Sequence, residues 1–389
     1  MEEWKEYKYT DLATIIGGGT PKTSVPEYWN GEIPWLSVKD FVSVAKYVYS
    51  SEKHISELGL LNSSTKLLEK NDIIISARGT VGAVAMIPCP MCFNQSCFGL
   101  RGNGIVDKNF LYYLTRTKID ELKQSAHGSV FDTITKETFD NLLCLVPPLQ
   151  LQQKIGKFLS SLDSKIEINQ RINDNLEQQA QVLFNHYFVD TPEILGDCTV
   201  GNLTDIASYL NGLAMQKYRP TTNDAGIPVL KIKELGQGKV DEHSDQCSEN
   251  IDSQYKVDNG DVIFSWSGTL MVKIWCGGEC GLNQHLFKVT SEKYPKWFYY
   301  FWTLHHLKKF IHIAQDKAVT MGHIKRSELE KSEVLIPSNK KLIEIDKIIS
   351  PLLAKIIALQ TECLNLTALR DTLLPKLMSG EVEINKINN

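Results

Sequence analysis

Two short turns in this 389-residue sequence carry groups that can bind nucleic acid, and each follows an apolar run. The first, NDIIISARGTVG at 71–82, presents Arg78 and Thr80 on either side of a glycine. The second, GDVIFSWSGTL at 260–270, places Trp266 where we match Arg78, with Lys273 close behind. Arginine and lysine bind guanine edges or phosphate, and hydroxyl and glycine amide groups bind phosphate. The exchange of Arg78 for Trp266 would let two similar turns recognise different bases, unless the turns are purely structural.

Other polar stretches add candidate contacts. GSVFDTITKETFD at 128–140 aligns with AVTMGHIKRSELE at 318–330, which forms a basic loop entering a short helix. A polar insertion around 217–219 precedes a segment that we interpret as a strand with alternating lysines. Solvated helix starts and exposed strands carry such residues too, so both interpretations stay open. The candidates in these stretches are Lys136, Lys217, Arg219, Lys231, Lys233, His323, Lys325 and Arg326.

Two amide pairs also recur, Asn94-Gln95 and Asn283-Gln284. Asparagine and glutamine can bind adenine through paired hydrogen bonds. However, identical residues in two surfaces that should recognise different bases favour a structural role, such as tying down a turn.

No motif for catalysis or metal binding stands out. The sequence lacks GxxxxGK[ST] and HExxH, and it lacks the Asn- or Asp-Pro-Pro-aromatic run of amino-methyltransferases. The nine cysteines do not combine into the four ligands of a structural zinc site. We therefore expect no catalytic residue, no metal and no cofactor in this chain, and reduced thiols.

The whole sequence is one unit of about 190 residues used twice, which is the pattern to seek before any single motif. DLATIIGGG at 11–19 resembles DIASYLNGL at 205–213, and IPWLSVKD at 33–40 resembles IPVLKIKE at 227–234, both 194 positions apart. From Asp72 and Asp261 onward the separation is 189 positions, so the copies differ by five residues in length before this point.

Each copy begins with about 140 residues of short β-like runs and some helical stretches, and it ends in a long helical pattern. Runs such as DIIIS and DVIFS between Gly, Asn and Asp turns indicate a compact α+β domain. Apolar residues at alternating spacings of three and four then predict a coiled-coil seam. Its predicted members are Leu159, Leu162, Ile166, Asn169, Asn173, Leu176 and Leu183 in the first copy, and Leu352, Ile356, Leu359, Leu366 and Leu373 in the second.

Each of these helices would be about 35–40 residues long, roughly 55–60 Å, which exceeds what one such domain can cover. The two helices therefore predict each other as antiparallel partners, with a domain at each end and a pseudo-two-fold axis. Asn169 and Asn173 would either fix the register or mark an opening for helices of another subunit. Pro351 would kink the second helix or mark its start.

Composition sets wider limits. The chain is 42% hydrophobic and 23% charged, with a formal net charge of −4, so strong DNA binding by this chain alone is disfavoured, although local basic loops are not. No apolar run reaches the roughly 18 residues of a membrane span, and MEEWKEYKYTDL does not look like a signal peptide. We expect a cytoplasmic protein without membrane contact.

Taken together, these segments resemble the specificity (S) subunits of type I restriction-modification enzymes. The resemblance covers essentially the whole chain and rests on ARGTVG, NQSCFGL, the run from LVPPLQLQQKIGKFLSSLDSK to NHYFVD, and LRDTLLPKLMSGEVEI. It implies a non-catalytic subunit with two target recognition domains, each binding one half of a bipartite, asymmetric site in double-stranded DNA. It also implies partners: two methyltransferase (M) subunits that methylate adenine at N6, and restriction (R) subunits. S-adenosylmethionine, ATP and Mg would belong to those partners.

The resemblance implies four segments: a first recognition domain at 1–148, a first spacer helix at 149–190, a second domain at 191–338 and a second helix at 339–389. Two alternatives remain at this stage. One is the S subunit of a related type II system whose partner fuses cleavage and methylation. The other is an adaptor that holds two protein partners apart and binds no DNA.

Overall fold

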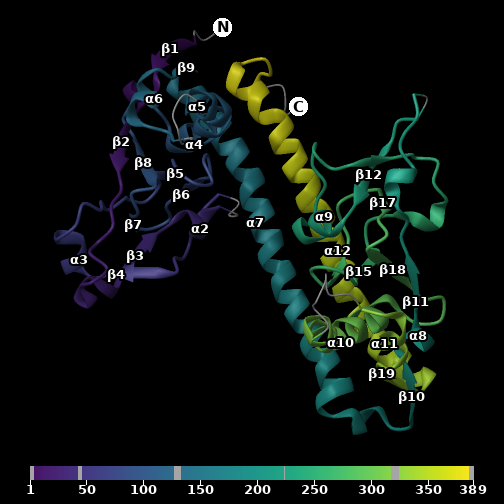
Figure 1. Cartoon of the computed structure of the whole chain (residues 1–389). Helices are drawn as coiled ribbons and strands as arrows, with labels where there is room; N and C mark the ends of the chain where they lie inside the picture. Colours follow the sequence, from purple (N-terminus) through teal and green to yellow (C-terminus); the bar gives the residue numbers. More distant parts are fainter. Residues whose placement is uncertain (1–3, 43–45, 127–132, 223, 317–323, 385–389) are drawn as a thin grey trace. The chain divides into compact units, whose positions relative to one another are not determined.

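The computed structural model describes residues 4–42, 46–126, 133–222, 224–316 and 324–384. Packing divides the chain into two units: unit 1 is Met1–Glu167 with Leu366–Asn389, and unit 2 is Ile168–Asn365. The divisions fall within two long helices, α7 (Leu149–Asn185) and α12 (Asn339–Ser379), so each unit contains part of both (Figure 1). The predicted segments 1–148, 149–190, 191–338 and 339–389 separate the globular domains from the long helices, whereas the packing units include parts of both helices. These four boundaries stay a prediction.

Unit 1 is built on two small sheets. Four antiparallel strands lie in the order β2-β8-β5-β6, three more in the order β4-β3-β7, and β1 pairs with β9. Every residue of β5 is buried because both faces of its sheet are covered. The strands are β1 (Lys5–Lys8), β2 (Ala13–Gly17), β3 (Trp29–Leu36), β4 (Lys53–Ile55), β5 (Ile73–Ser76), β6 (Val84–Met86), β7 (Cys92–Phe93), β8 (Cys97–Gly102) and β9 (Leu143–Val146).

Helices cover one face of the four-stranded sheet in unit 1. Phe110 and Leu114 of α4 pack with Ile155 and Leu159 of α7, and the cluster is completed by Leu377 from the far end of the chain. The short helices are α1 (Tyr9–Leu12), α2 (Val38–Phe41), α3 (Glu57–Leu61), α4 (Lys108–Thr117), α5 (Ile119–Ala126) and α6 (Lys136–Asp140). Unit 1 therefore depends on a helix that belongs to the second copy of the repeat.

Unit 2 repeats this architecture with one additional strand, β14, in its second sheet. Its sheets have the orders β11-β18-β15-β16 and β13-β12-β17-β14, and β10 pairs with β19. The strands are β10 (Cys198–Asn202), β11 (Ser208–Asn211), β12 (Ile227–Leu230), β13 (Gln246–Cys247), β14 (Lys256–Val257), β15 (Val262–Ser265), β16 (Met271–Ile274), β17 (Cys280–Leu282), β18 (Leu286–Thr290) and β19 (Glu333–Pro337). The repeat in the sequence is thus a repeat in topology.

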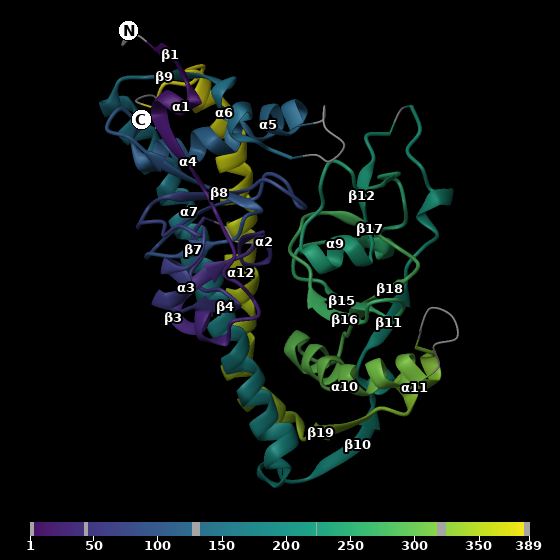
Figure 2. The ribbon, with the colours of Figure 1, turned by 60° about the vertical axis from the view of Figure 1, so that its left-hand side comes forward.

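The helices of unit 2 follow the same plan. Where unit 1 has α4 and α5, unit 2 has one helix, α10 (Lys296–Asp316), which packs against β16 and β18 of the main sheet (Figure 2). Ala180 and Phe184 of α7 complete this core, beside Ile349 and Ile356 of α12. The short helices are α8 (Leu203–Ile206), α9 (Ile232–Gln237) and α11 (Arg326–Glu330).

A buried ion pair joins the two long helices inside unit 1. Arg370 Nη1 lies 2.6 Å from Asp163 Oδ1, and the two side chains are 8% and 1% exposed. The Tyr113 hydroxyl of α4 donates to the other carboxylate oxygen, and burial followed by the charge of Asp163 raises the pKa of that tyrosine. A charged hydrogen bond in this setting holds three helices in one register, because slippage would leave a buried charge without a partner.

The corresponding position in unit 2 is apolar. Along these helices the copies are 190 positions apart, which places Leu353 opposite Asp163 and Ala180 opposite Arg370 in the repeat. Leu353 and Ala180 lie in one buried cluster. The two copies of the repeat thus stabilise the equivalent contact between the long helices differently, by an ion pair in unit 1 and by apolar packing in unit 2.

Asn169 supports the register-fixing interpretation. It is fully buried, and its Nδ2 donates to Glu362 Oε2 over 2.8 Å in unit 2. Farther along, Gln360 Nε2 donates to Glu177 Oε1, so the order of contacts along α7 and α12 is antiparallel. The Oδ1 atoms of Asn169 and Asn173 are nevertheless buried without a hydrogen-bond partner among the described residues, so the alternative of an opening for another chain is not removed.

The predicted seam is buried in part. Leu159, Ile166, Ile356 and Leu359 are buried, whereas Leu162, Leu176, Leu183, Leu352, Leu366 and Leu373 are half-buried. In three places the neighbour along the chain is buried instead, namely Phe184, Leu353 and Leu374. Pro351 does not mark a helix start, because α12 runs through it. In the described ranges, no helix combines the length and the apolar character needed to cross a membrane.

Replacing Arg370 by leucine should show how strongly folding depends on the buried ion pair. The variant leaves the buried Asp163 carboxylate with the Tyr113 hydroxyl but without a cation, so we expect a loss of about 3–5 kcal/mol in the free energy of unfolding. The double variant D163L/R370L resembles the apolar counterpart in unit 2 and should recover most of this loss. Urea unfolding followed by circular dichroism measures both. Equal instability of the single and double variants would contradict this account.

A buried lysine anchors a segment of unit 1 to this scaffold. Lys46 is 4% exposed, and its ammonium donates to Asn109 Oδ1 at 2.9 Å and to Ser160 Oγ at 2.6 Å. It also lies 5.1–5.4 Å from the ring centroids of Tyr47, Tyr112 and Tyr113. Burial lowers the pKa of Lys46 to about 8, an effect that the charges of Asp163, Asp107 and Glu167 offset only in part.

This shift predicts a dependence of stability on pH. The pKa of Lys46 falls from 10.5 in the unfolded chain to about 8 in the folded one, so between these values the unfolded chain binds more protons. Stability should therefore rise with pH through this window, relative to the variant Lys46→Met. Urea unfolding of both proteins at several pH values across the window tests this, and parallel pH profiles would rule it out.

Candidate nucleic-acid interface

The turn after β5 is held open by its own backbone and one hydroxyl. Ser76 Oγ accepts from the Ala83 amide at 2.8 Å and donates to the Thr80 carbonyl, while Gly79 takes a positive φ of 75°. A side chain at that φ would be strained, so glycine fits the turn. Arg78 and Thr80 are left exposed.

The loop that enters α6 is tied to this turn. The Ile134 amide donates to the Ala77 carbonyl at 3.1 Å, and Lys136 follows as an exposed first residue of α6. The structure therefore brings Arg78, Thr80 and Lys136, predicted separately from the sequence, onto adjoining loops. We call these three residues the unit 1 turn surface.

Unit 2 builds the same junction with different side chains. The Ile324 amide donates to the Trp266 carbonyl at 3.0 Å, Gly268 has a φ of 64°, and Lys325 and Arg326 are exposed where α11 begins. Thr269, Lys325 and Arg326 form the unit 2 turn surface. His323 falls outside the described residues.

The equivalent hydrogen bonds correct one detail of the sequence alignment. Trp266 corresponds to Ala77, and Ser267 corresponds to Arg78, so the predicted exchange of Arg78 for Trp266 is off by one residue. The Trp266 indole donates to Asn211 Oδ1 at 2.9 Å and packs on the ring of Phe287. These contacts anchor the half-buried Trp266 in the turn, and its predicted contact with a base stays a prediction.

The remaining lysine candidates are mostly engaged within the protein. Lys231 and Lys233 are not on a strand, because β12 ends at Leu230 and the two lysines lie at the start of α9. Lys231 pairs with Asp245 and holds the pKa of that carboxyl below its usual range. Lys233 pairs with Asp241 at 3.3 Å.

The remaining predicted DNA-contact residues, Lys273, Lys217 and Arg219, lie in two different parts of unit 2. Lys273 of β16 donates to the Gly236 carbonyl at 2.8 Å. Lys217 and Arg219, in contrast, are exposed in the insertion between β11 and β12. For the recurring amide pairs the structure favours the structural role, since Asn94 Oδ1 accepts from the Ser96 amide and Asn283 Oδ1 from the His285 amide.

A second polar surface, which the sequence reasoning missed, lies at the same edge of each unit. In unit 1 a cleft of about 240 Å³ is lined by Trp35, Ser37, Lys39, Asp40, Glu52 and Lys53. In unit 2 a cleft of about 330 Å³ beside β12 and β13 is lined by Met215, Gln216, Arg219, Pro220, Val229, Asp245 and Gln246. The signal was present in the repeat of IPWLSVKD and IPVLKIKE, whose polar positions differ between copies. We call these the edge clefts.

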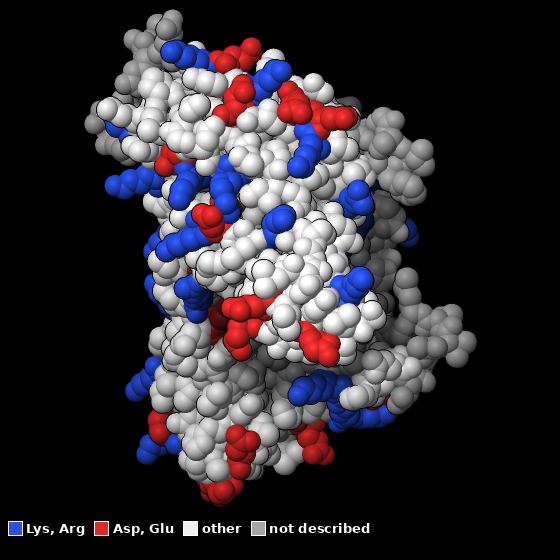
Figure 3. All heavy atoms as spheres, turned by 90° about the vertical axis from the view of Figure 1, so that its left-hand side faces the viewer, with Lys and Arg blue, Asp and Glu red and all other residues white. Residues whose placement is uncertain are grey.

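Charge over the surface is mixed. Lys and Arg are interspersed with Asp and Glu over the face shown in Figure 3, in keeping with a net charge of −4. All nine cysteines lie in the described ranges and are free thiols. Within those same ranges no three His, Cys, Asp or Glu side chains are grouped in a way that could hold a metal ion. The turn surfaces and edge clefts present hydroxyl, amide, amino and guanidinium groups that can form hydrogen bonds.

Comparison with known proteins agrees with this geometry. The family model for the type I restriction modification DNA specificity domain matches residues 1–178 and again residues 196–367. The chain therefore belongs to this family, as the sequence resemblance predicted.

Individual relatives extend the match to the whole chain. The type I restriction enzyme MjaIX specificity subunit of Methanocaldococcus jannaschii is 29% identical and covers 99% of this chain and 95% of its own length. The EcoR124I/EcoR124II specificity subunit of Escherichia coli is 30% identical over 48% of this chain and 46% of its own. Among solved structures, the type I S subunit of M. genitalium has a TM-score of 0.58 at 16% identity, covering 97% of this chain and 96% of that one. This likeness confirms the predicted fold of two repeated α+β domains with long helices.

Removing the two cations of the unit 2 turn surface should weaken DNA binding in a salt-dependent way. If Lys325 and Arg326 each contact one phosphate, the variant K325A/R326A should lower the slope of log affinity against log salt by about 2. Lys347→Ala, an exposed lysine of α12, is the matched control and should leave the slope unchanged. Fluorescence anisotropy with duplex DNA over a salt series measures this. An unchanged slope in the double variant would exclude the turn surface from phosphate contact.

Proposed function

We propose that this chain is the DNA sequence-recognition subunit of a type I restriction-modification complex and recognises a bipartite, asymmetric site. One observation carries the proposal: the same scaffold occurs twice, and each copy presents a turn surface and an edge cleft with different polar side chains. In place of the exposed Arg78 and Lys136 of unit 1, unit 2 has the buried Ser267 and the exposed Lys325 and Arg326. Base recognition depends on the donors and acceptors of such side chains, so two different half-sites follow.

The long helices support a second role as a docking surface for the methyltransferase subunits. Several large apolar side chains on α7 and α12 are exposed, including Ile168, Val182 and Leu369 at 53%, 65% and 45%. A shallow groove on α7 is lined by Ile168, Arg171, Ile172, Asn175 and Leu176. Exposed apolar surface of this kind marks a partner interface. Two methyltransferase subunits, one for each copy of the repeat, are the proposed partners, with restriction subunits joining the assembly.

Catalysis is assigned to those partners. This chain's sequence has no nucleotide-binding loop and no adenine methyltransferase motif. In the proposed complex, S-adenosylmethionine, ATP and Mg are used by the methyltransferase and restriction subunits, while this chain supplies the position on DNA. Membership of the specificity family disfavours the adaptor alternative.

Exchange of one recognition domain tests the modular part of this proposal. Replacing residues 197–337 by the equivalent domain of a relative should change one half of the methylated motif and leave the other half and the gap unchanged. The physical reason is that unit 1 keeps its own sheets, turn surface and edge cleft. A genome-wide map of N6-methyladenine measures the motif.

The same map in cells with the gene deleted is the reference. There, one split asymmetric motif should disappear entirely. An unchanged map on deletion would refute the function itself. A change in both halves or in the gap after domain exchange would refute only the modular arrangement.

A further inference from the structure

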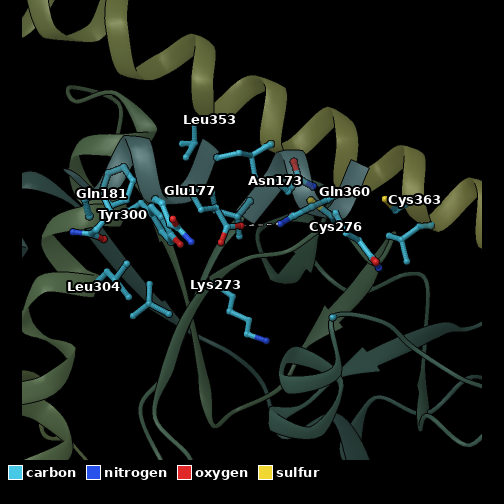
Figure 4. Close-up of a pocket in the computed structure, with 18 of the residues that line it drawn as sticks. Asn173, Glu177, Gln181, Lys273, Cys276, Tyr300, Leu304, Leu353, Gln360 and Cys363 are labelled. Atoms are coloured by element: carbon cyan, nitrogen blue, oxygen red, sulfur yellow. Dashed lines mark hydrogen bonds between the residues drawn. The ribbon is translucent and has the colours of Figure 1, made fainter. Parts of the chain in front are cut away.

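Unit 2 contains a large cavity that the recognition of DNA does not use. It has a volume of about 870 Å³ and lies among α7, α12, α10 and β16 (Figure 4). This volume is within the range of sites that hold ligands. Its polar lining includes Asn173, Glu177, Gln181, Lys273, Tyr300 and Gln360.

The repeat provides an internal comparison, because the corresponding place in unit 1 is filled. There the Met86 amide of β6 donates to the Lys46 carbonyl at 2.7 Å, and the Val48 amide donates to the Met86 carbonyl at 3.2 Å. Residues 46–48 thus add to the outer edge of β6, and Tyr47 packs against the core of unit 1.

Unit 2 lacks this segment for a reason visible in the sequence. The two copies differ by five residues between Asp40 and Asp72 in the first and Glu234 and Asp261 in the second. In unit 2, α9 ends at Gln237 and is capped by Gly238, whose φ of 71° reverses the chain and whose amide donates to the Glu234 carbonyl at 2.8 Å. Glycine is the residue that takes such a left-handed helix end without strain. The chain therefore reverses without pairing with the outer edge of β16, although the Lys273 side chain of that strand reaches the Gly236 carbonyl of α9.

As a result, the outer edge of β16 is unpaired. Ile274 corresponds to Met86, and it faces Val262 of β15 as Met86 faces Ile73. The next residue, Trp275, bonds inward to the Asp261 carbonyl at 2.8 Å, so in an antiparallel ladder the amide and carbonyl of Ile274 point outward. Among the described residues nothing bonds to them. Ile274 lines the cavity, so this open edge borders it.

Two further polar groups in the cavity have few partners. Asn173 is 5% exposed, and its Oδ1 has no hydrogen-bond partner in the part of the chain that the structure describes. Glu177 accepts from Gln360 Nε2 at 3.2 Å, as the dashed line in Figure 4 marks. Lys273 donates to the Gly236 carbonyl at 2.8 Å, but its charge also acts on Glu177 and partly offsets the rise in the pKa of Glu177 that burial and Asp174 cause. Among the described residues no cation forms an ion pair with the Glu177 carboxylate, whose hydrogen bond comes from the Gln360 amide, and this leaves room for a basic side chain.

We propose that the cavity of unit 2 binds an extended peptide segment of a partner protein, which pairs with the outer edge of β16 and directs a lysine or arginine toward Glu177. The open backbone edge selects an extended peptide over a compact small molecule, because it offers one donor and one acceptor at strand spacing. Unit 1 shows the same solution within its own chain, where a lysine-bearing segment occupies the matching edge. The proposal does not depend on the recognition of DNA.

The test uses the full chain and a labelled nine-residue peptide with the sequence of residues 42–50, VSVAKYVYS. Fluorescence anisotropy should show saturable binding in the absence of DNA. Amide hydrogen exchange should slow at Ile274 when the peptide is added, because its amide gains an acceptor. Saturable binding without protection of Ile274, or no binding at all, would overturn the proposal. So would tighter binding of small amphipathic molecules in place of the peptide.

Two variants test separately how much the backbone edge of β16 and the charge of Glu177 contribute to peptide binding. Ile274→Pro removes an outward amide, which an edge strand tolerates, and should abolish peptide binding; Ile274→Val, which shortens the half-buried side chain but keeps the amide, is its control and should bind the peptide. Glu177→Gln should weaken binding by about tenfold, as expected for loss of one charged hydrogen bond. Glu292→Gln is the control, since Glu292 is an exposed acid of unit 2 that does not line the cavity. Equal affinity of E177Q and E292Q would exclude Glu177 as the contact. Because the assay contains no DNA, its failure leaves the proposed function untouched.

Discussion

The structure depends on one constraint: neither copy of the repeat can bury its own core without the long helix of the other. Leu374 and Leu377 of α12 complete the core around α4 in unit 1, and Ala180 and Phe184 of α7 complete the core around α10 in unit 2. Burial of apolar area is the main favourable term in folding, so this exchange of helices is what stabilises both units. The ion pair between Asp163 and Arg370 then selects the register in which the exchange occurs.

Most of the architecture follows from the sequence, because repetition and periodicity are signals that span many residues. The offset of 189 positions and the spacing of apolar residues in α7 and α12 indicated two α+β domains and two long antiparallel helices. The predictions from the sequence were wrong where the result depended on the exact position of a single residue. The match of Trp266 to Arg78 was off by one, and Lys231 and Lys233 lie at the start of α9 rather than on a strand. A local pattern of lysines does not distinguish a strand from a helix start, and only the hydrogen bonds do.

The candidate interface was harder to predict than the scaffold, and the reason is physical. Arg78 and Lys136 are 58 positions apart, yet the backbone hydrogen bond from the Ile134 amide to the Ala77 carbonyl makes their loops neighbours. The edge clefts combine residues from two strands and a loop, which no single stretch of sequence displays. Within one scaffold, such surface side chains can change while the buried contacts stay, so the two units keep a common fold and differ in what they contact.

The exchange of helices also orders the events of synthesis. A ribosome completes all strands of unit 1 long before it makes Leu374 and Leu377, which lie within the last part of the chain. Unit 2, by contrast, has all its residues once Asn365 has been added. The domain that is made first is therefore finished last, and it waits with part of its core exposed to solvent. A premature stop shortly before residue 366 would damage the amino-terminal domain, the one most distant in sequence from the lesion.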